Sequence, residues 1–535
     1  MRKTPVLTPQ EAALLVRDGD TLASGGFVSS ACPEALSSAL ERRFLETGHP
    51  RDLTLFFGAG HGNRNGTGGD HYGHAGMVRR VVCGHWDRTP RLGALALEGK
   101  IEAYNLPQGV ITHMYRDIAA HNPATLSKVG LHTFVDPRLE GGKLNGRTKE
   151  DLVKLVEVEG QEFLLYRCFP VNAVFLRASW ADEYGNCTAH REIGPTDLTA
   201  MAQACRNSGG KVIVQVEKIV AGGTLDPKLV VIPGIYVDAI VVGSEAEHQQ
   251  CMDAAYDGSL TGEFRAPADA LAPLPLDARK VIARRAAMEL RPGAVVNLGV
   301  GIPERVARVA AEEGISQEMT LTVEAGSVGG VPRGGTQFGG AANPAAILPQ
   351  NVQFDFYHGG GLDIACLGMA EIAPGGDVNV SRFHGRLAGS GGFIDISQNA
   401  GEVVFCGTFT AHGLDAVCED GKLVVQREGD VGKFVSAVEQ VTFSGDYAVR
   451  RGQRVLYVTE LAVFALQSGG VTLTEIAPGI DLQTQILDQM AFMPRISEDL
   501  KLMDERIFQP GLMGLGRGDL HKNKREKQEE QTKWH

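Results

Sequence analysis

The stretch Met319-Thr-Leu-Thr-Val-Glu-Ala-Gly-Ser-Val-Gly-Gly330 decides the fold of this chain and supplies its leading candidate for chemistry. Its first five residues are apolar or β-branched, which predicts a short buried strand. Glu324 follows where that strand ends, and a glycine-rich turn comes next. Ligands of open α/β sheets bind outside the carboxyl ends of the strands, so a carboxylate there is accessible to a ligand. The alternative is that Glu324 caps the turn or is simply solvated.

A similar pattern near the N-terminus indicates an internal duplication. Residues 52–60, Asp-Leu-Thr-Leu-Phe-Phe-Gly-Ala-Gly, read as a strand that runs into a glycine loop, as residues 319–326 do. Before each of these strands, paired glycines are followed by a Pro-Glu pair, at Pro33 and at Pro303, that opens a predicted helix. Each copy is therefore expected to be a strand–glycine loop–helix–strand unit.

The two copies differ where chemistry is expected. Aligning Thr54 with Thr320 places Gly58 opposite Glu324, so one copy offers a carboxylate and the other only backbone. This is the pattern of a single active site built between two similar domains. The alternative is that Gly58 only makes a tight turn, which the duplication does not exclude.

The sequence predicts an α/β fold made of two fused, duplicated open domains with mostly parallel sheets. The first domain is expected to span 1–264, and residues 265–276, which carry three prolines, form a linker. The second domain is expected to span 277–515 and to begin with a helix capped by Asp277. Residues 516–535 mix Lys, Arg, Glu and Gln without an apolar face, which predicts a disordered tail.

Composition limits the classes of function. The net charge of −12 argues against nucleic-acid binding, which needs a basic surface. The nine cysteines form no C-x-x-C pair, which is typical of reduced thiols and makes a structural zinc site improbable. No apolar run is long enough for a signal peptide core or a membrane span, so we expect a cytoplasmic protein without a membrane partner.

Two further glycine loops are candidate ligand sites. Gly299-Val-Gly-Ile-Pro303 is a predicted strand-to-helix turn, whose amides can hold a phosphate or a pantetheine chain or can merely make the turn. Ala388-Gly-Ser-Gly-Gly-Phe393 contains flexible residues that are costly to order inside a domain. We expect its backbone to approach a ligand or to donate N–H groups to an oxyanion. His358-Gly-Gly-Gly361 is a third such loop with the same interpretation, and the alternative for both loops is that they are plain loops.

Other constellations are less specific. His61, His71 and His74 with Asp70 have no helical or strand spacing that aligns their rings, so no metal site is predicted. Arg333 either meets a carboxylate or phosphate or is a solvated surface residue. No G-x-S-x-G elbow and no phosphate-binding loop of the P-loop type occur.

With Val323-Glu-Ala-Gly-Ser-Val-Gly-Gly330, Asn297-Leu-Gly-Val-Gly-Ile-Pro303 and Gly389-Ser-Gly-Gly-Phe393 in place, the chain resembles a family I CoA-transferase. More narrowly, it is similar to the propionate (acetate, lactate) CoA-transferases. Supporting stretches span nearly the whole chain and include Gly84-His-Trp86 and Glu102-Ala-Tyr-Asn-Leu-Pro-Gln-Gly109. His358 departs from the pattern, because relatives usually carry an acidic residue there, and the tail is longer than the family needs.

The resemblance implies that Glu324 is catalytic, that coenzyme A is a substrate, and that the protein uses neither a metal nor a tightly bound cofactor. It also implies a homotetramer or a homodimer. The expected oxyanion and pocket residues are Gly25, Gly26, Phe27, Gly391 and Gly392. The expected CoA-binding residues are Gly299, Val300, Gly301, Ile302, Pro303 and Gly389.

The predicted function is the transfer of CoA between a short-chain acyl-CoA and a free short-chain carboxylate, such as propionate, acetate or lactate. We expect ping-pong chemistry through a glutamyl–CoA thioester at Glu324. An acyl-CoA hydrolase on the same scaffold is one alternative, and it differs in letting water reach the intermediate. A small-ligand sensor without enzymatic activity is the alternative from another class. The sequence leaves open the acyl chain length and the preferred acceptor.

Overall fold

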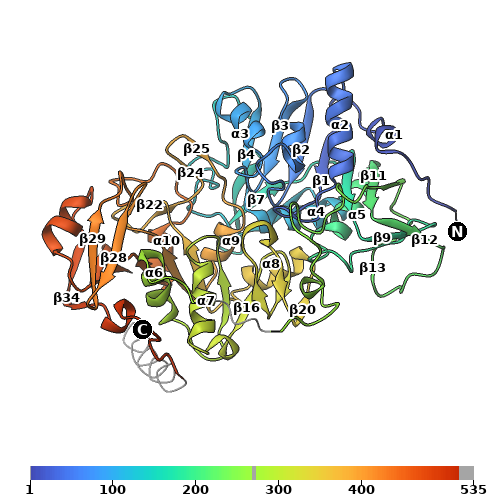
Figure 1. Cartoon of the computed structure of the whole chain (residues 1–535). Coiled ribbons are helices and arrows are strands. Elements are labelled where there is room, and N and C mark those ends of the chain that lie inside the picture. Colours follow the sequence, from blue (N-terminus) through green and yellow to red (C-terminus); the bar gives the residue numbers. More distant parts are fainter. Residues whose placement is uncertain (1, 268–272, 517–535) are drawn as a thin grey trace. The chain divides into compact units, whose positions relative to one another are not determined.

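The computed structural model describes residues 2–267 and 273–516 as a mixed α/β protein (Figure 1). The chain divides into two compact units. Unit 1 contains the residues up to Ala266 together with Val323–Phe356 and Arg386–Asp395, and unit 2 contains Pro267–Thr322, Tyr357–Gly385 and the residues from Ile396 onward. Glu324 and the loop 388–392 therefore both belong to unit 1.

Parts of two predicted segments lie outside the described residues, namely 268–272 of the linker and 517–535 of the tail. Compact units defined by contacts need not coincide with duplicated sequence domains, so the predicted domain boundaries stay a prediction. No helix within residues 2–267 and 273–516 is long and apolar enough to cross a membrane.

Unit 1 is built on a seven-stranded sheet in the order β14-β11-β8-β1-β2-β3-β4, and every pairing in it is parallel. All five residues of β2 are buried, as expected for a parallel strand with both faces covered. The strands are β1 (Thr21–Ser24), β2 (Leu53–Phe57), β3 (Val78–Cys83), β4 (Glu102–Asn105), β8 (Ala173–Arg177), β11 (Lys211–Val216) and β14 (Ala239–Val242).

Smaller sheets complete the β-structure of unit 1. The three-stranded sheet β5-β7-β6 joins Ala124–Ser127, Gln161–Arg167 and Val153–Val158. The four-stranded sheet β12-β9-β10-β13 joins Lys218–Val220, Trp180–Asp182, Cys187–Thr188 and Val230–Ile232. Two short antiparallel pairs join β17 (Ser327–Val328) with β20 (Ala346–Ile347) and β18 (Val331–Pro332) with β19 (Ala341–Ala342).

The helices of unit 1 begin with a short one, since α1 covers only Pro9–Ala13 after a capping box at Thr8. In α2, Leu36 and Leu40 are buried and form an apolar stripe, whereas Leu45 is 63% exposed and lies outside this stripe. The remaining helices are α2 (Glu34–Thr47), α3 (Pro90–Leu97), α4 (Gln108–Ala119) and α5 (Leu198–Asn207); α8 (Gln350–His358) and α9 (Phe393–Ser397) begin in unit 1 and end in unit 2.

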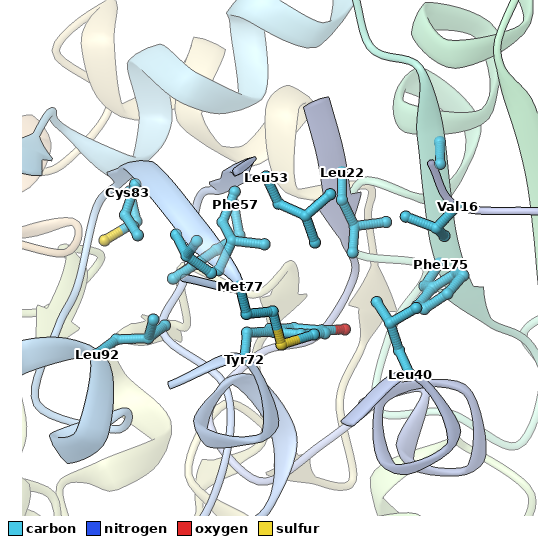
Figure 2. Close-up of a cluster of buried hydrophobic side chains, with 14 of the residues drawn as sticks. Val16, Leu22, Leu40, Leu53, Phe57, Tyr72, Met77, Cys83, Leu92 and Phe175 are labelled. Atoms are coloured by element: carbon cyan, nitrogen blue, oxygen red, sulfur yellow. The ribbon is translucent and has the colours of Figure 1, made fainter. Parts of the chain in front are cut away.

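The core of unit 1 lies between the sheet and the helices that cover it. Figure 2 shows Leu22 and Phe57 from the sheet gathered with Leu40 of α2 and with Tyr72 and Met77. All five side chains are buried. This packing holds the carboxyl ends of β1, β2 and β3, and so the loops that follow them, on a rigid base.

Unit 2 is built on eight neighbouring strands in the order β16-β15-β21-β26-β31-β32-β33-β34. The pairings from β16 to β31 are parallel, those joining β31, β32 and β33 are antiparallel, and β34 lies parallel to β33. The strands are β15 (Val295–Leu298), β16 (Thr320–Thr322), β21 (Ile364–Gly368), β26 (Glu402–Cys406), β31 (Arg454–Val458), β32 (Ala462–Gln467), β33 (Gly470–Ile476) and β34 (Arg495–Leu502).

Three helices and several short strands surround this sheet. Asp277 caps the first helix as predicted, since its carboxylate accepts a hydrogen bond of 2.8 Å from the Lys280 N–H. Val306, Val309 and Ala310 form the buried face of the second helix. The helices are α6 (Ala278–Ala287), α7 (Glu304–Glu312) and α10 (Gly445–Arg450). The short strands are Glu371–Ile372, Val378–Asn379, Arg382–Phe383, Thr410–Ala411, Asp415–Glu419, Lys422–Arg427 and Val431–Gly432. A further short strand, Arg386–Leu387, belongs to unit 1.

The duplication expected from the sequence is present in the backbone. In unit 1 the chain runs β1–α2–β2 and pairs the two strands in parallel, and in unit 2 it runs β15–α7–β16 with the same parallel pairing. The predicted strand 319–323 corresponds to β16. The expectation of an α/β fold with mostly parallel sheets is confirmed.

Candidate active site

Glu324 lies in a tight turn that begins where β16 ends. The Gly326 N–H donates to the Val323 carbonyl (2.9 Å), and the Val323 N–H donates to the Ser327 carbonyl (2.9 Å). Gly326 has φ +124°, and a Cβ atom there would lie 1.9 Å from the Leu348 carbonyl oxygen, so only glycine fits. The turn therefore fixes the direction in which the Glu324 side chain leaves the backbone.

The Glu324 carboxyl is covered by the loop 388–392. A Cβ atom built on Gly392 would lie 2.3 Å from Glu324 Oε2 and 3.3 Å from the ring of Phe354. Gly392 thus brings backbone against the carboxyl, and any side chain at 392 would require the loop or the Glu324 side chain to move. Phe354, from α8, is fully buried and closes the site beside Gly392.

The loop 388–392 is held in place by the loops that follow β3 and β4. The Gly391 N–H donates to the Gly84 carbonyl (2.6 Å), and the Gln108 N–H donates to the Gly391 carbonyl (3.0 Å). Asn105 accepts from the Ser390 N–H (2.8 Å) while its amide nitrogen donates to the Gly84 carbonyl (2.6 Å). Because these bonds link three loops, the covering loop is rigid.

The environment makes Glu324 an unusually weak acid. Its side chain is partly buried, and this burial, followed by the negative charge of Asp395, raises its pKa to about 8. The side-chain amide of Gln108 acts in the opposite direction and lowers the pKa. A carboxylate with so high a pKa is a stronger nucleophile than an ordinary one and is still ionised in part near neutral pH.

Several polar atoms around Glu324 have no hydrogen-bond partner of normal geometry among the described residues, although they are buried. They are His85 Nδ1, Gln108 Nε2 and Ser390 Oγ, with Trp86 Nε1 close by in the chain. Burial also lowers the pKa of His85 to about 4, so its ring is neutral at pH 7. Since buried polar groups of native proteins nearly always have hydrogen-bond partners, this set of atoms indicates a site where a polar ligand supplies the missing partners.

Gly25, Gly26 and Phe27 follow β1. The Gly26 backbone has φ +141°, and a Cβ atom there would lie 2.8 Å from the His61 side chain. The fully buried Phe27 ring stacks on Phe338 at 6.1 Å and shares an apolar cluster with the two neighbours of Glu324 in sequence. These residues support the Glu324 turn through packing, and their role as pocket walls stays a prediction.

The Gly391 N–H, predicted to face an oxyanion or the pocket, donates to the Gly84 carbonyl. A role of Gly391 in the reaction stays a prediction. Gly391 leaves space, since a Cβ atom there would lie 3.4 Å from the His85 ring and 3.7 Å from Gln108 Oε1. Gly389 has φ +81° and lies against the backbone of His85 and Trp86.

Gly299 to Pro303 form the turn between β15 and α7 in unit 2. The Gly299 N–H donates to the Cys366 carbonyl (2.8 Å), which anchors the start of the turn. Val300 is 56% exposed, and a Cβ atom at Gly301 would meet nothing within 4 Å. The turn is therefore open, and CoA binding by Gly299, Val300, Gly301, Ile302 and Pro303 stays a prediction.

The histidines near the N-terminal glycine loop have carboxylate partners. His71 lies between Glu34 (2.6 Å) and Glu41, and His74 also bonds Glu41 (2.7 Å). Within residues 2–267 and 273–516, no group of three or more His, Cys, Asp or Glu side chains is arranged to hold a metal ion. Arg333 lies 3.7 Å from Asp257 in a partly exposed ion pair.

The sequence did not single out Gln108, Phe354, Asp395 or His85 as site residues. A signal existed for two of them, because His85 and Gln108 follow parallel strands β3 and β4 at the ligand-binding edge of the sheet. In the sequence, Phe354 resembles an ordinary core residue of a helix, and Asp395 resembles an acidic residue in the first turn of a helix. No local pattern therefore indicates that either belongs to the site.

Comparison with known proteins gives consistent matches. Residues 6–243 match the family model described as Coenzyme A transferase. The chain is 45% identical over 517 residues to acetate CoA-transferase YdiF of Escherichia coli (strain K12), covering 96% of this chain and 97% of that protein. It is 45% identical over 515 residues to caffeate CoA-transferase of Acetobacterium woodii, covering 95% and 98%. The crystal structure of acyl-CoA transferase YdiF of E. coli O157:H7, a thioester complex with CoA, matches at 44% identity with a TM-score of 0.91 and covers 96% of this chain and 98% of that one.

Proposed function

Because this chain belongs to the coenzyme A transferase family, it is an enzyme that moves CoA between an acyl-CoA and a carboxylate, and we propose that Glu324 carries the CoA between them. This proposal rests on the environment of the Glu324 carboxyl. The Gly392 backbone covers this carboxyl, and burial raises its pKa to about 8. The printed description of the YdiF crystal structure as a thioester complex with CoA supports a covalent path.

The proposed reaction is a double displacement. Ionised Glu324 attacks the thioester carbonyl of the acyl-CoA, the C–S bond breaks, and CoA leaves as a thiolate with an acyl–glutamyl anhydride left behind. The thiolate then attacks the glutamyl carbonyl, which releases the first carboxylate and forms a glutamyl–CoA thioester. The incoming acid reverses both steps, so that a new acyl-CoA leaves and Glu324 is free again.

Each addition step places negative charge on a carbonyl oxygen. We assign its stabilisation to the Gly392 N–H and to Gln108 Nε2, which is buried without a partner of normal geometry among the described residues. One such donor typically contributes about 3–4 kcal/mol to transition-state binding. Phe354 and the loop 388–392 exclude water from the anhydride, which would otherwise be hydrolysed.

The substrate acid is proposed to be a short monocarboxylate of the acetate, propionate or lactate type. Support comes from the likeness to acetate CoA-transferase and from the crowding of Glu324 by Phe354 and Gly392. The equal identity to caffeate CoA-transferase favours a second candidate, an aromatic acid such as a hydroxycinnamate. The homo-oligomer and the cytoplasmic location stay predictions.

A panel of acceptor acids tests the proposal. With acetyl-CoA as donor, we expect transfer to propionate and lactate at rates well above transfer to caffeate, and loss of all transfer in Glu324→Gln. Faster transfer to caffeate would assign the aromatic substrate class instead. Rapid CoA release without any acceptor would indicate the hydrolase alternative, and normal transfer by Glu324→Gln would overturn the role of Glu324.

A further inference from the structure

Asp395 is a fully buried acid that follows directly on the covering loop of the active site. It lies in α9, three residues after Gly392. Its Oδ2 accepts a hydrogen bond of 3.2 Å from the Gly109 N–H, in the first turn of α4. This hydrogen bond ties the end of the covering loop to the first turn of α4.

The contact between Asp395 and α4 is too close for any side chain at residue 109. A Cβ atom on Gly109 would lie 2.6 Å from Asp395 Oδ1 and 2.5 Å from the ring of Phe354. Phe354 in turn packs beside Gly392, which covers Glu324. Asp395 is therefore locked into the same packed group of residues that shapes the site.

Asp395 also acts on Glu324 through its charge. After burial, it is the largest cause of the raised pKa of Glu324. The other groups that face this pair are the Gln108 amide of α4, the neutral His85 ring after β3, and the phenol of Tyr166 in β7, on which Asp395 also acts. Two carboxyl groups thus share one desolvated region, which disfavours a charge on both.

We propose that Asp395 is a positioning residue of the transfer reaction, which anchors the loop 388–392 to the first turn of α4 and keeps a second negative charge beside Glu324. This inference rests on the proposed role of Glu324 as the nucleophile. The charge of Asp395 raises the energy of ionised Glu324 before attack. As Glu324 attacks, its negative charge moves onto the substrate, so the repulsion falls in the transition state and the reaction is faster.

This role predicts a specific change in the dependence of rate on pH. Asparagine at 395 keeps an oxygen that can accept from Gly109 but removes the charge. Glu324 then ionises at lower pH and is a weaker nucleophile once ionised. The acid limb of the profile should therefore move to lower pH by about one unit, while the plateau rate at high pH falls about tenfold.

The experiment measures the first half-reaction, the formation of enzyme–CoA from acetyl-CoA without acceptor, between pH 5.5 and 9.5. Wild type is compared with Asp395→Asn and with Asp355→Asn. Asp355 is a matched control, since it is half exposed and paired with Arg116 (2.8 Å) and His113 (3.1 Å). We expect the acid limb of the pH–rate profile to shift only in Asp395→Asn.

An Asp395→Asn profile that is lower than wild type at every pH but keeps its acid limb would overturn the inference, because a purely structural anchor predicts that result. Should Asp395→Asn not fold, Asp395→Ser, which leaves room for water, is expected to show the same shift, and an unshifted limb there counts equally against it. Failure of wild type itself to form enzyme–CoA would instead contradict the proposed role of Glu324.

Discussion

Gly392 lies directly against the Glu324 carboxyl at the candidate active site: a Cβ atom at residue 392 would lie 2.3 Å from Glu324 Oε2. The two residues come from different loops of unit 1, and the loop of Gly392 is tied to the loops after β3 and β4 by Gly84 and Gln108. These hydrogen bonds fix the covering loop, while the turn of Glu324 is fixed by its own bonds at Val323 and Gly326. We expect the rate of the proposed reaction to depend on the relative position of Glu324 and Gly392.

The first prediction concerns Gly392→Ala. The added methyl group must displace either the loop or the Glu324 carboxyl, and a displacement of about 1 Å at a reacting group typically lowers a rate ~100-fold. We expect kcat for CoA transfer to fall by about that factor while the far-ultraviolet circular dichroism stays the same. Gly93→Ala in α3 is the control, because a Cβ atom there meets nothing within 4 Å. Loss of activity in both variants, or in neither, would contradict the prediction.

The second prediction links stability to pH. The pKa of Glu324 is about 8 in the folded protein against an ordinary value of 4.5, so the folded state holds the extra proton between these values. The contribution of Glu324 to the free energy of unfolding therefore falls as pH rises through this window, by at most about 1.4 kcal/mol per pH unit. Glu324→Gln lacks this loss, so its Tm relative to wild type should rise from pH 5 to pH 8.

The control for this prediction is Glu98→Gln, because Glu98 is exposed and forms a surface ion pair with Lys100 (2.6 Å), and such pairs contribute little to stability. Its Tm difference from wild type should stay small. A Tm difference for Glu324→Gln that does not change with pH would show that the Glu324 carboxyl is not desolvated.

The third prediction concerns Asn105, which joins three backbone groups of the site. Its amide nitrogen donates to the Cys83 and Gly84 carbonyls, and its oxygen accepts from the Ser390 N–H. Asn105→Ala leaves these buried groups without partners, which costs about 1–3 kcal/mol of folding free energy. We expect a lower Tm together with a kcat reduced more than KM is raised. Asn207→Ala, whose amide meets only the Ala119 carbonyl at the surface, should change neither.

How far the sequence predicts this protein can be judged from particular residues. β16 and Glu324 are predictable because a β-branched run followed by glycines has few other structures available to it. The duplicated strand–helix–strand unit is predictable because both copies repeat the same turn residues. The position of Asp395 in the site is not predictable, since it depends on a contact with Gly109, which lies 286 positions away in the chain. Tertiary packing alone brings the two together.

The apolar stripe of α2 shows a limit of the same kind. Leu36 and Leu40 are buried one turn apart, and Phe44 continues their stripe by packing against the core in the last turn of α2. Leu45 follows Phe44 by one residue, about 100° around the helix, and is 63% exposed. Gly391 shows another limit. Its place in a glycine-rich loop is evident from sequence, but the engagement of its N–H by Gly84 is visible only in the structure.

The fourth prediction concerns a buried ion network in unit 2. Arg285 of α6 donates two hydrogen bonds to Glu475 (2.8 and 2.9 Å) and one to Glu289 (2.7 Å), and all three side chains are buried. Arg285→Met leaves two buried carboxylates without this partner, which typically costs about 3–5 kcal/mol. Urea unfolding should show this loss.

The matched control for Arg285 is Arg450→Met. Arg450 and Asp446 are both exposed and pair across one turn of α10, and such surface pairs contribute about 0.3–0.5 kcal/mol. An equal loss of stability in the two variants would mean that the network around Arg285 is no more desolvated than a surface pair.

The account depends most directly on the covalent link between CoA and Glu324. Wild-type protein incubated with acetyl-CoA alone should gain the mass of CoA less one water, and peptide mapping should place the adduct on the peptide that contains Glu324. The adduct should disappear when acetate is added in excess, and it should never form in Glu324→Gln. A wild-type protein that transfers CoA at full rate with no adduct, or with the adduct on another residue, would contradict the account.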